Sequence, residues 1–109
     1  MSFNNNNNNS DNDNSEKFLI ISLNVNHNKN LGGLLNIIRT RNPTIICLQE
    51  VSQDTQELNK MVSRLGYTGI SNLGIDRRPG VAILHLKTLP VIEIRNLDQG
   101  RLQILHSQG

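Results

Sequence analysis

The sequence predicts a single small α/β domain with a mixed β-sheet, following an asparagine-rich tail. Two apolar segments with a helical pattern between them begin the domain, and three strand-like segments in series end it. The chain has 109 residues, which is enough for one hydrophobic core. The first fifteen residues contain eight asparagines and almost no apolar side chain, so they cannot contribute to that core.

The tail has the composition of a low-complexity segment. Asn4–Asn9 is an uninterrupted asparagine run, which is typical of disordered sequence. We therefore expect residues 1–15 to be disordered and residues 16–109 to form the folding unit. From Glu16 onward, eleven basic residues face seven acidic ones, a net charge of +4, which slightly favours an anionic partner such as nucleic acid.

The first half of the domain reads as strand, helix, strand. Residues 18–23 form a nearly continuous apolar run, which predicts a strand covered on both faces, and the polar residues 24–30 predict a loop. A helix should follow, because leucine or isoleucine recurs with helical spacing at positions 31, 34, 35 and 38. Pro43 ends this helix by moving Asn42 out of the α region. Residues 44–49 predict a second buried strand.

The second half reads as a helix and then mainly strands. Leu58, Met61, Val62 and Leu65 predict a helix over residues 54–65, which Gly66 ends. A short strand over residues 67–73 and a loop over 74–79 should follow. Further strands are predicted over residues 80–86, 90–97 and 101–106, with a hairpin turn at 98–100. We expect these three strands to form an antiparallel meander, which makes the sheet mixed.

Several function classes are disfavoured by composition. No window approaches the roughly eighteen apolar residues of a membrane span, and the start does not resemble a signal peptide. We therefore expect a soluble intracellular protein, nuclear or cytoplasmic, without a membrane partner. Cys47, the single cysteine, lies in an apolar segment and is expected to be a small buried hydrophobe.

Asn24 and Glu50 are the candidate catalytic and metal-binding residues. If the first two strands are parallel neighbours, the right-handed crossover brings their carboxyl ends to one edge of the sheet, where α/β proteins tend to bind ligands. A carboxylate beside an amide can start a Mg²⁺ site that a substrate phosphate completes. The alternative is a solvent-facing glutamate and a turn-forming asparagine, and spacing alone leaves both open.

Other polar residues are less specific. His27 follows Asn24 in the predicted loop and could act near the site, whereas His85 and His106 fall inside predicted strands and are expected to be structural. Arg77 and Arg78 could contact a phosphate backbone, although a solvated charge pair in a loop is the commoner arrangement.

Four segments in the right order resemble the endonuclease/exonuclease/phosphatase superfamily. They are Ser22-Leu23-Asn24-Val25-Asn26, Pro43 to Val51 with its Leu48-Gln49-Glu50, Gly80-Val81-Ala82-Ile83-Leu84 and Asp98-Gln99-Gly100-Arg101. The nearest likeness is to the N-terminal part of the apurinic-endonuclease-like domain of non-LTR retrotransposons. The resemblance implies a four-layered α/β sandwich that cleaves phosphodiester bonds of DNA or RNA with Mg²⁺. It assigns Asn24 to the first active-site asparagine and Glu50 to the metal-binding glutamate.

The sequence departs from the family pattern at two places. His27 stands where the family often has glycine, and the later tyrosine, Asp-x-Asn and Ser-Asp-His motifs would lie beyond Gly109. We therefore expect a partial domain over residues 16–109 that is inactive alone. Two alternatives are a non-catalytic nucleic-acid-binding remnant of a retroelement and a fragment of a phosphoinositide or sphingolipid phosphodiesterase.

Overall fold

The computed structural model describes residues 18–108, so the predicted disorder of residues 1–15 lies outside the described part. The elements follow the predicted order. They are β1 (Ile20–His27), α1 (Leu31–Arg41), β2 (Ile45–Val51), α2 (Thr55–Val62), the short 3₁₀ turn η1 (Ser63–Leu65), β3 (Tyr67–Asn72), the 3₁₀ turn η2 (Ile75–Arg77), β4 (Gly80–Leu86), β5 (Val91–Leu97) and β6 (Leu102–Ser107).

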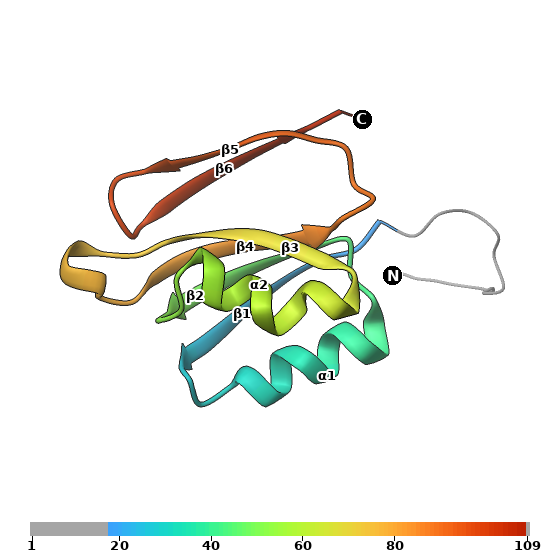
Figure 1. The fold of residues 1–109 in the computed structure, drawn as a ribbon, viewed down its shortest axis with the longest axis horizontal. Helices are drawn as coiled ribbons and strands as arrows, with labels where there is room; N and C mark the ends of the chain where they lie inside the picture. Colours follow the sequence, from blue (N-terminus) through green and yellow to red (C-terminus); the bar gives the residue numbers. More distant parts are fainter. Residues whose placement is uncertain (1–17, 109) are drawn as a thin grey trace, which may run out of the picture.

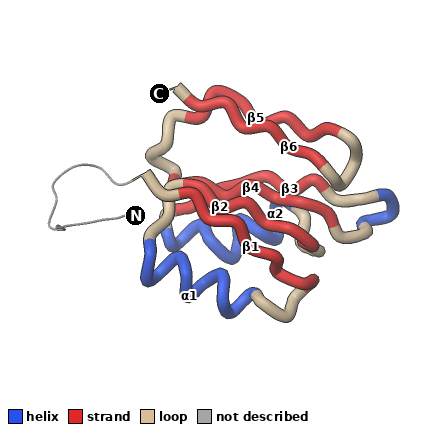
Figure 2. Tube along the Cα trace, turned by 180° about the vertical axis from the view of Figure 1, so that it is seen from behind, coloured by secondary structure: helices blue, strands red, loops and turns tan. Residues whose placement is uncertain are grey.

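The elements stack in three layers, with a mixed sheet in the middle (Figure 1). This sheet has the strand order β1-β2-β4-β3, and β1 pairs with β2 in parallel while the other pairings are antiparallel. Helices α1 and α2 lie on one face and the β5–β6 hairpin lies on the other, as the view from behind also shows (Figure 2). The predicted α/β class and mixed sheet are confirmed, and the arrangement fits the N-terminal portion of an α/β sandwich.

The predicted antiparallel meander of the last three strands is wrong in one respect. Strand β4 pairs with β2 on one side and β3 on the other, so neither edge of β4 can accept β5. After Pro90 the chain crosses to the other layer, where β5 pairs only with β6 among the described strands. The hairpin turn itself is confirmed, with Gly100 at φ +84°, a conformation that glycine adopts without steric cost.

The prediction that the first strand is covered on both faces is also wrong. Strand β1 lies at the edge of the sheet, and the β5–β6 hairpin stands over the β3–β4 side. Ile20, Ser22 and Asn24 are consequently exposed, whereas Val25 is buried on the helix side. The strand also continues to His27, through residues that were predicted as a loop.

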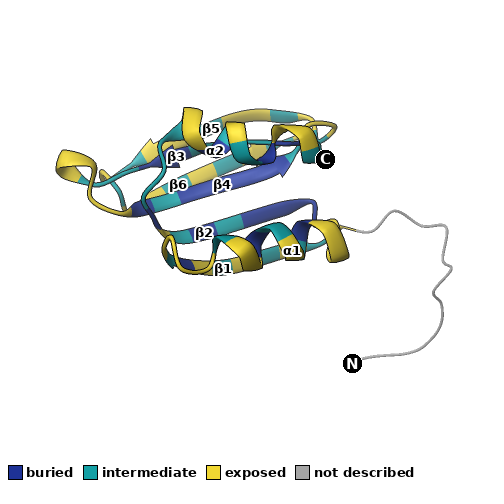
Figure 3. Ribbon diagram, turned by 60° about the horizontal axis from the view of Figure 1, so that its bottom comes forward, coloured by how far each residue is buried: buried dark blue, intermediate teal, exposed yellow. Residues whose placement is uncertain are grey.

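The main core lies between the helices and the sheet. Leu34 and Ile38 of α1 and Leu58 and Val62 of α2 are buried against it, as the helical spacing predicted. Figure 3 shows buried residues along β2 and β4, while the helices are exposed on their outer sides. Burying each such aliphatic side chain contributes about 2 kcal/mol of transfer free energy.

Asn72 anchors the hairpin layer to the sheet. This side chain is 8% exposed, and its Nδ2 donates to the backbone oxygens of Leu97 and Leu102, each at 2.9 Å. Its Oδ1 accepts from the backbone amide of Gly100 at 3.1 Å. All three partners lie at the turn end of the hairpin, so Asn72 ties that end to the sheet. Asn96 and Gln103 of the hairpin add further links, since they donate to the backbone oxygens of Ser71 and Ile70.

Within residues 18–108, neither helix has the length and apolar character needed to cross a bilayer.

Candidate active site

Asn24 and Glu50 lie side by side at the sheet edge. The Nδ2 of Asn24 donates a hydrogen bond to Oε2 of Glu50 at 2.9 Å, and both residues are exposed. The Oδ1 of Asn24 is turned away and accepts from the backbone amide of Asn26 at 2.8 Å. The predicted juxtaposition of the two side chains is therefore observed, and the asparagine presents its donor side to the carboxylate.

Two β-bulges coincide at this position. Between strands β1 and β2, Asn24 pairs with Gln49 and the next pair is His27 with Val51. Strand β1 therefore has one more residue than β2 between these two pairs. Between β2 and β4, Gln49 pairs with Val81 and the next pair is Val51 with Gly80, so Glu50 is the extra residue. Bulges of this kind change the direction of a side chain.

The bulge in β2 keeps Glu50 out of the core. Leu48 is buried on the helix side, so strict alternation would direct Glu50 to that side as well. Instead Glu50 is exposed, and Val51 fills the buried place at 0% exposure. Burying an unpaired carboxylate would cost several kcal/mol, and one inserted residue avoids this while keeping the strand paired.

Both bulges hold residues in the left-handed region of backbone space. Glu50 has φ +55°, Asn26 has φ +47° and His27 has φ +63°. Side chains with a Cβ adopt this region at a cost of about 1 kcal/mol or more each. Three such residues within one small area of the surface are consistent with a site whose geometry is set at some cost in stability.

His27 is the third polar side chain at the site. Its Nε2 lies 3.9 Å from Oε1 of Glu50, the carboxylate oxygen that does not bond to Asn24. The side chains of His27 and Glu50 are 56% and 48% exposed, so both can be reached from solvent. In strict alternation His27 would face the helix layer with Val25, and the bulge in β1 turns it outward instead.

The loop that follows β1 is tied to its surroundings. The Nδ2 of Asn30 donates to the backbone oxygen of Asn24 at 2.9 Å, and the Asn30 amide donates to the Val25 oxygen at 3.1 Å. Gln53, in the loop after β2, donates from Nε2 to Oδ1 of Asn28. The Asn30 bonds tie the loop back to β1, and the Gln53 bond joins the loops that follow the two strands carrying His27 and Glu50.

The arginine pair divides into one paired and one exposed residue. Arg77 donates to Oε1 of Glu57 at 2.7 Å and lies 3.7 Å from Oδ2 of Asp54. Both acidic residues belong to the capping box that starts α2, so Arg77 has a structural contact here. Arg78 is exposed beside it.

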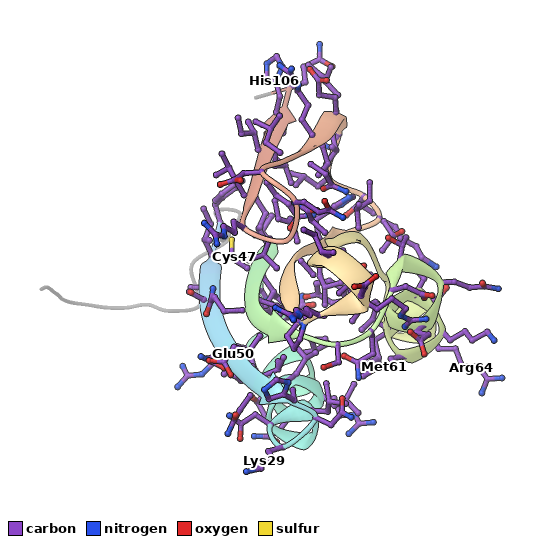
Figure 4. All side chains as sticks on the ribbon, turned by 90° about the vertical axis from the view of Figure 1, so that its left-hand side faces the viewer. Lys29, Cys47, Glu50, Met61, Arg64 and His106 are labelled. Carbon is purple, nitrogen blue, oxygen red and sulfur yellow. The ribbon has the colours of Figure 1, made fainter. Side chains whose placement is uncertain are left out.

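The remaining histidines and the cysteine lie elsewhere. His85 is buried, with Nδ1 at 2.8 Å from the Leu86 oxygen, whereas His106 is exposed on β6. Figure 4 places His106 at the top of the view, in the hairpin layer, and Glu50 well below it. Cys47 is half-buried on β2, and burial raises the pKa of its thiol above the ordinary value of 9.0. A protonated thiol is a poor nucleophile, which fits the predicted role as a small hydrophobe.

The residues present suit a weakly held hard cation. Glu50 offers a solvent-accessible carboxylate, and Mg²⁺ is commonly bound through one or two carboxylates, several waters and substrate phosphates. No cluster of three or more acidic, histidine or cysteine side chains suited to a metal ion occurs within residues 18–108. The carboxylate therefore fits such an ion as one of a few protein ligands.

The bulges were missed by sequence reasoning, whereas His27 was expected near the site and lies there at the end of β1. A signal was present, because the apolar Val51 follows Glu50 directly and the polar stretch Asn26-His27 follows Val25. A buried residue directly after a charged one, at the end of an apolar strand, is what an inserted residue produces. Pattern alone does not say which of the two residues is the extra one.

Comparison with known proteins supports the resemblance. A sequence model described as the endonuclease/exonuclease/phosphatase family matches residues 21–108, which is most of the chain. The matched region includes Asn24, His27 and Glu50. No protein in the curated set matches the chain.

Proposed function

Since the chain belongs to the endonuclease/exonuclease/phosphatase family, we propose that Asn24 and Glu50 form one side of a Mg²⁺-dependent phosphodiesterase site that acts on nucleic acid. The observation that carries the proposal is the 2.9 Å hydrogen bond between these two side chains at the carboxyl ends of parallel strands. Residues 26 apart in sequence are brought into contact there by the crossover through α1.

The two side chains have complementary tasks in this proposal. Glu50 is a ligand of the cation, which when bound would neutralise charge that develops on the scissile phosphate. Asn24 fixes one oxygen of that carboxylate through its Nδ2 and leaves the other oxygen directed toward solvent and His27. As the ligand and its orienting partner come from different strands, their relation depends on the parallel pairing of β1 and β2.

Nucleic acid is the proposed substrate class, with retroelement-like endonucleases as the nearest functional type. The net charge of residues 16–109 is +4. Arg78 and Arg101 are exposed, and the turn that carries Arg101 packs against the loop that leads to Arg78, with Gly100 close to Gly74. Both arginines thus come from loops at the end of the sheet where β2 ends beside Gly80, so they can contact phosphates near the site.

We further propose that the 109-residue polypeptide binds its substrate but does not cleave it unaided. Hydrolysis of a phosphodiester needs an activated water and stabilisation of the leaving oxygen, and the pair supplies one carboxylate and one amide. In this proposal the reaction therefore requires groups in addition to this pair.

Binding of DNA in the presence of Mg²⁺ tests the site. Fluorescence anisotropy with a short labelled duplex should show that Mg²⁺ tightens binding by the wild-type chain severalfold, and that Glu50→Gln loses this increment. Glu93→Gln is the matched control, because Glu93 is an exposed carboxylate on β5. An equal Mg²⁺ increment in wild type and Glu50→Gln would contradict the assignment of Glu50.

A plasmid-nicking assay tests the proposed inactivity separately from the proposed role of Glu50. We expect no Mg²⁺-dependent nicking of supercoiled or abasic plasmid by the isolated chain. Nicking that Glu50→Gln abolishes would keep the site and refute the inactivity. Binding to phosphoinositide vesicles in place of DNA would point to the lipid phosphodiesterases of the same family.

A further inference from the structure

We propose that His27 is a second protein ligand at this site and shifts its preference from Mg²⁺ toward divalent transition metals such as Mn²⁺, Co²⁺ and Ni²⁺. The inference rests on the proposed role of Glu50 as a cation ligand. It concerns a residue whose side chain lies beside the Glu50 carboxylate at the register shift of β1.

The distance between the two donor atoms fits a shared ion after a small adjustment. Nε2 of His27 and Oε1 of Glu50 are 3.9 Å apart. Ligand atoms about 2.1 Å from one metal ion, at tetrahedral or octahedral angles, lie about 3 to 3.4 Å from each other. Both side chains are about half exposed, so a side-chain rotation that moves either donor atom by less than about 1 Å brings the two atoms to that separation without disturbing the core.

The two oxygens of the Glu50 carboxylate have different neighbours. Oε2 of Glu50 accepts from Asn24, and Oε1 faces the imidazole. A hydrogen bond to one oxygen of a ligating carboxylate orients the other oxygen, which is the usual arrangement around bound metal ions. Asn24 therefore serves the pair as a positioning residue and need not bind the ion itself.

The two bulges are what bring the imidazole and the carboxylate together. One inserted residue in β1 turns His27 outward, and one in β2 turns Glu50 outward, at neighbouring positions of the same ladder. The contacts from Asn30 to Asn24 and from Gln53 to Asn28 hold both loops in place. A pair held in this way loses less conformational entropy when it binds an ion than two independent surface side chains would.

A site with one imidazole nitrogen and one carboxylate oxygen should prefer transition metals over Mg²⁺. Imidazole nitrogen is a good ligand for first-row transition metals, whereas Mg²⁺ takes oxygen ligands almost exclusively. Removing His27 should therefore weaken Ni²⁺ or Mn²⁺ binding and leave Mg²⁺ binding as it was. Removing the Glu50 carboxylate should weaken both, because both kinds of ion use it.

Equilibrium dialysis of the untagged full chain against NiCl₂ or MgCl₂ alone tests this. We expect His27→Gly to weaken Ni²⁺ binding about tenfold and to leave Mg²⁺ binding unchanged, and Glu50→Gln to weaken both. His27→Gly should fold, since glycine accepts the φ of +63°, and His27→Asn is a second variant with the same tolerance. His106→Asn controls for a surface histidine remote from the site.

Each result decides one of the two proposals. Unchanged Ni²⁺ binding in both His27 variants, with loss in Glu50→Gln, overturns the role of His27 and keeps that of Glu50. No loss in Glu50→Gln for either ion overturns the metal site as a whole. As a site-specific measurement, Mn²⁺ should broaden the ring-proton NMR signals of His27 and spare those of His106, and equal broadening of both would also overturn the inference.

Discussion

Two asparagines lie at the same end of one sheet, on its two opposite edge strands, and have opposite surroundings. Asn24 on β1 is exposed, lies beside two bulges and bonds to the Glu50 carboxylate. Asn72 on β3 is buried, lies at the end of a register without a shift, and bonds to three backbone groups of the hairpin. One asparagine holds a charged group at the surface, and the other holds two layers together.

The difference follows from what covers each strand. The β5–β6 hairpin stands over β3 and β4, so polar groups there must be satisfied within the protein. Strand β1 is an edge strand with an open face, so its polar groups can remain partly hydrated and can accept a ligand. The side chain that links the two layers therefore lies on the β3–β4 side, and the proposed site lies on the β1–β2 side.

The largest expected effect is from Asn72→Ala. It removes three hydrogen bonds to part-buried backbone groups of the hairpin, and we expect it to lower the free energy of unfolding by about 3 kcal/mol. Asn24→Ala, the matched control at the exposed position, should lower it by less than about 1 kcal/mol. Urea unfolding followed by circular dichroism measures both. Equal losses of unfolding free energy in the two variants would contradict the proposed difference between the β3–β4 side and the β1–β2 side.

Glu50→Gly should have a smaller effect of opposite sign. Glycine relieves the left-handed backbone at φ +55°, and we expect a gain of about 1 kcal/mol in the free energy of unfolding. The same variant should lose Mg²⁺ binding, because the carboxylate is gone. Glu50→Ala keeps the strain and is the control for loss of the side chain alone. A Glu50→Gly variant less stable than Glu50→Ala would show that the backbone there is not strained.

Some of this could be predicted from the sequence because it depends on local patterns. The helical stripes that include Leu34 and Leu58, the end of α1 before Pro43 and the turn at Gly100 all follow from spacing or backbone preference. The contact of Asn24 with Glu50 was also predictable, since parallel pairing of two strands joined by a crossover helix brings their carboxyl ends together.

The rest depends on pairings between distant segments. That β1 is an edge strand and that β5 cannot join β4 are decided by which strands occupy each side of β2 and β4. The bulges that expose His27 and Glu50 are properties of two ladders at once, and no window of one strand contains them. Asn24 and Asn72 are the same residue type near the ends of two predicted strands, so composition could not separate their roles.

The smallest expected effect is a loss of stability at alkaline pH, and it arises from two residues in the regular part of the sheet. Burial raises the pKa of the Cys47 thiol above 9.0 and that of the Tyr67 hydroxyl above 10.0. Each folded-state pKa then exceeds its unfolded value, so the native state keeps a proton that the unfolded chain releases. The resulting stability is fully present below about pH 9 and is lost as pH rises through the folded pKa values.

Cys47→Ala isolates the first of these two contributions. Between about pH 8 and pH 10, where the thiol of the unfolded chain ionises, the wild type should lose more stability than the variant. Urea midpoints under reducing conditions measure the difference. Parallel pH profiles would mean that the thiolate is tolerated where Cys47 faces Ile83 of β4. The solvent-accessible face of the sheet near Asn24 would then extend along β2 as far as Cys47, although this residue is half-buried.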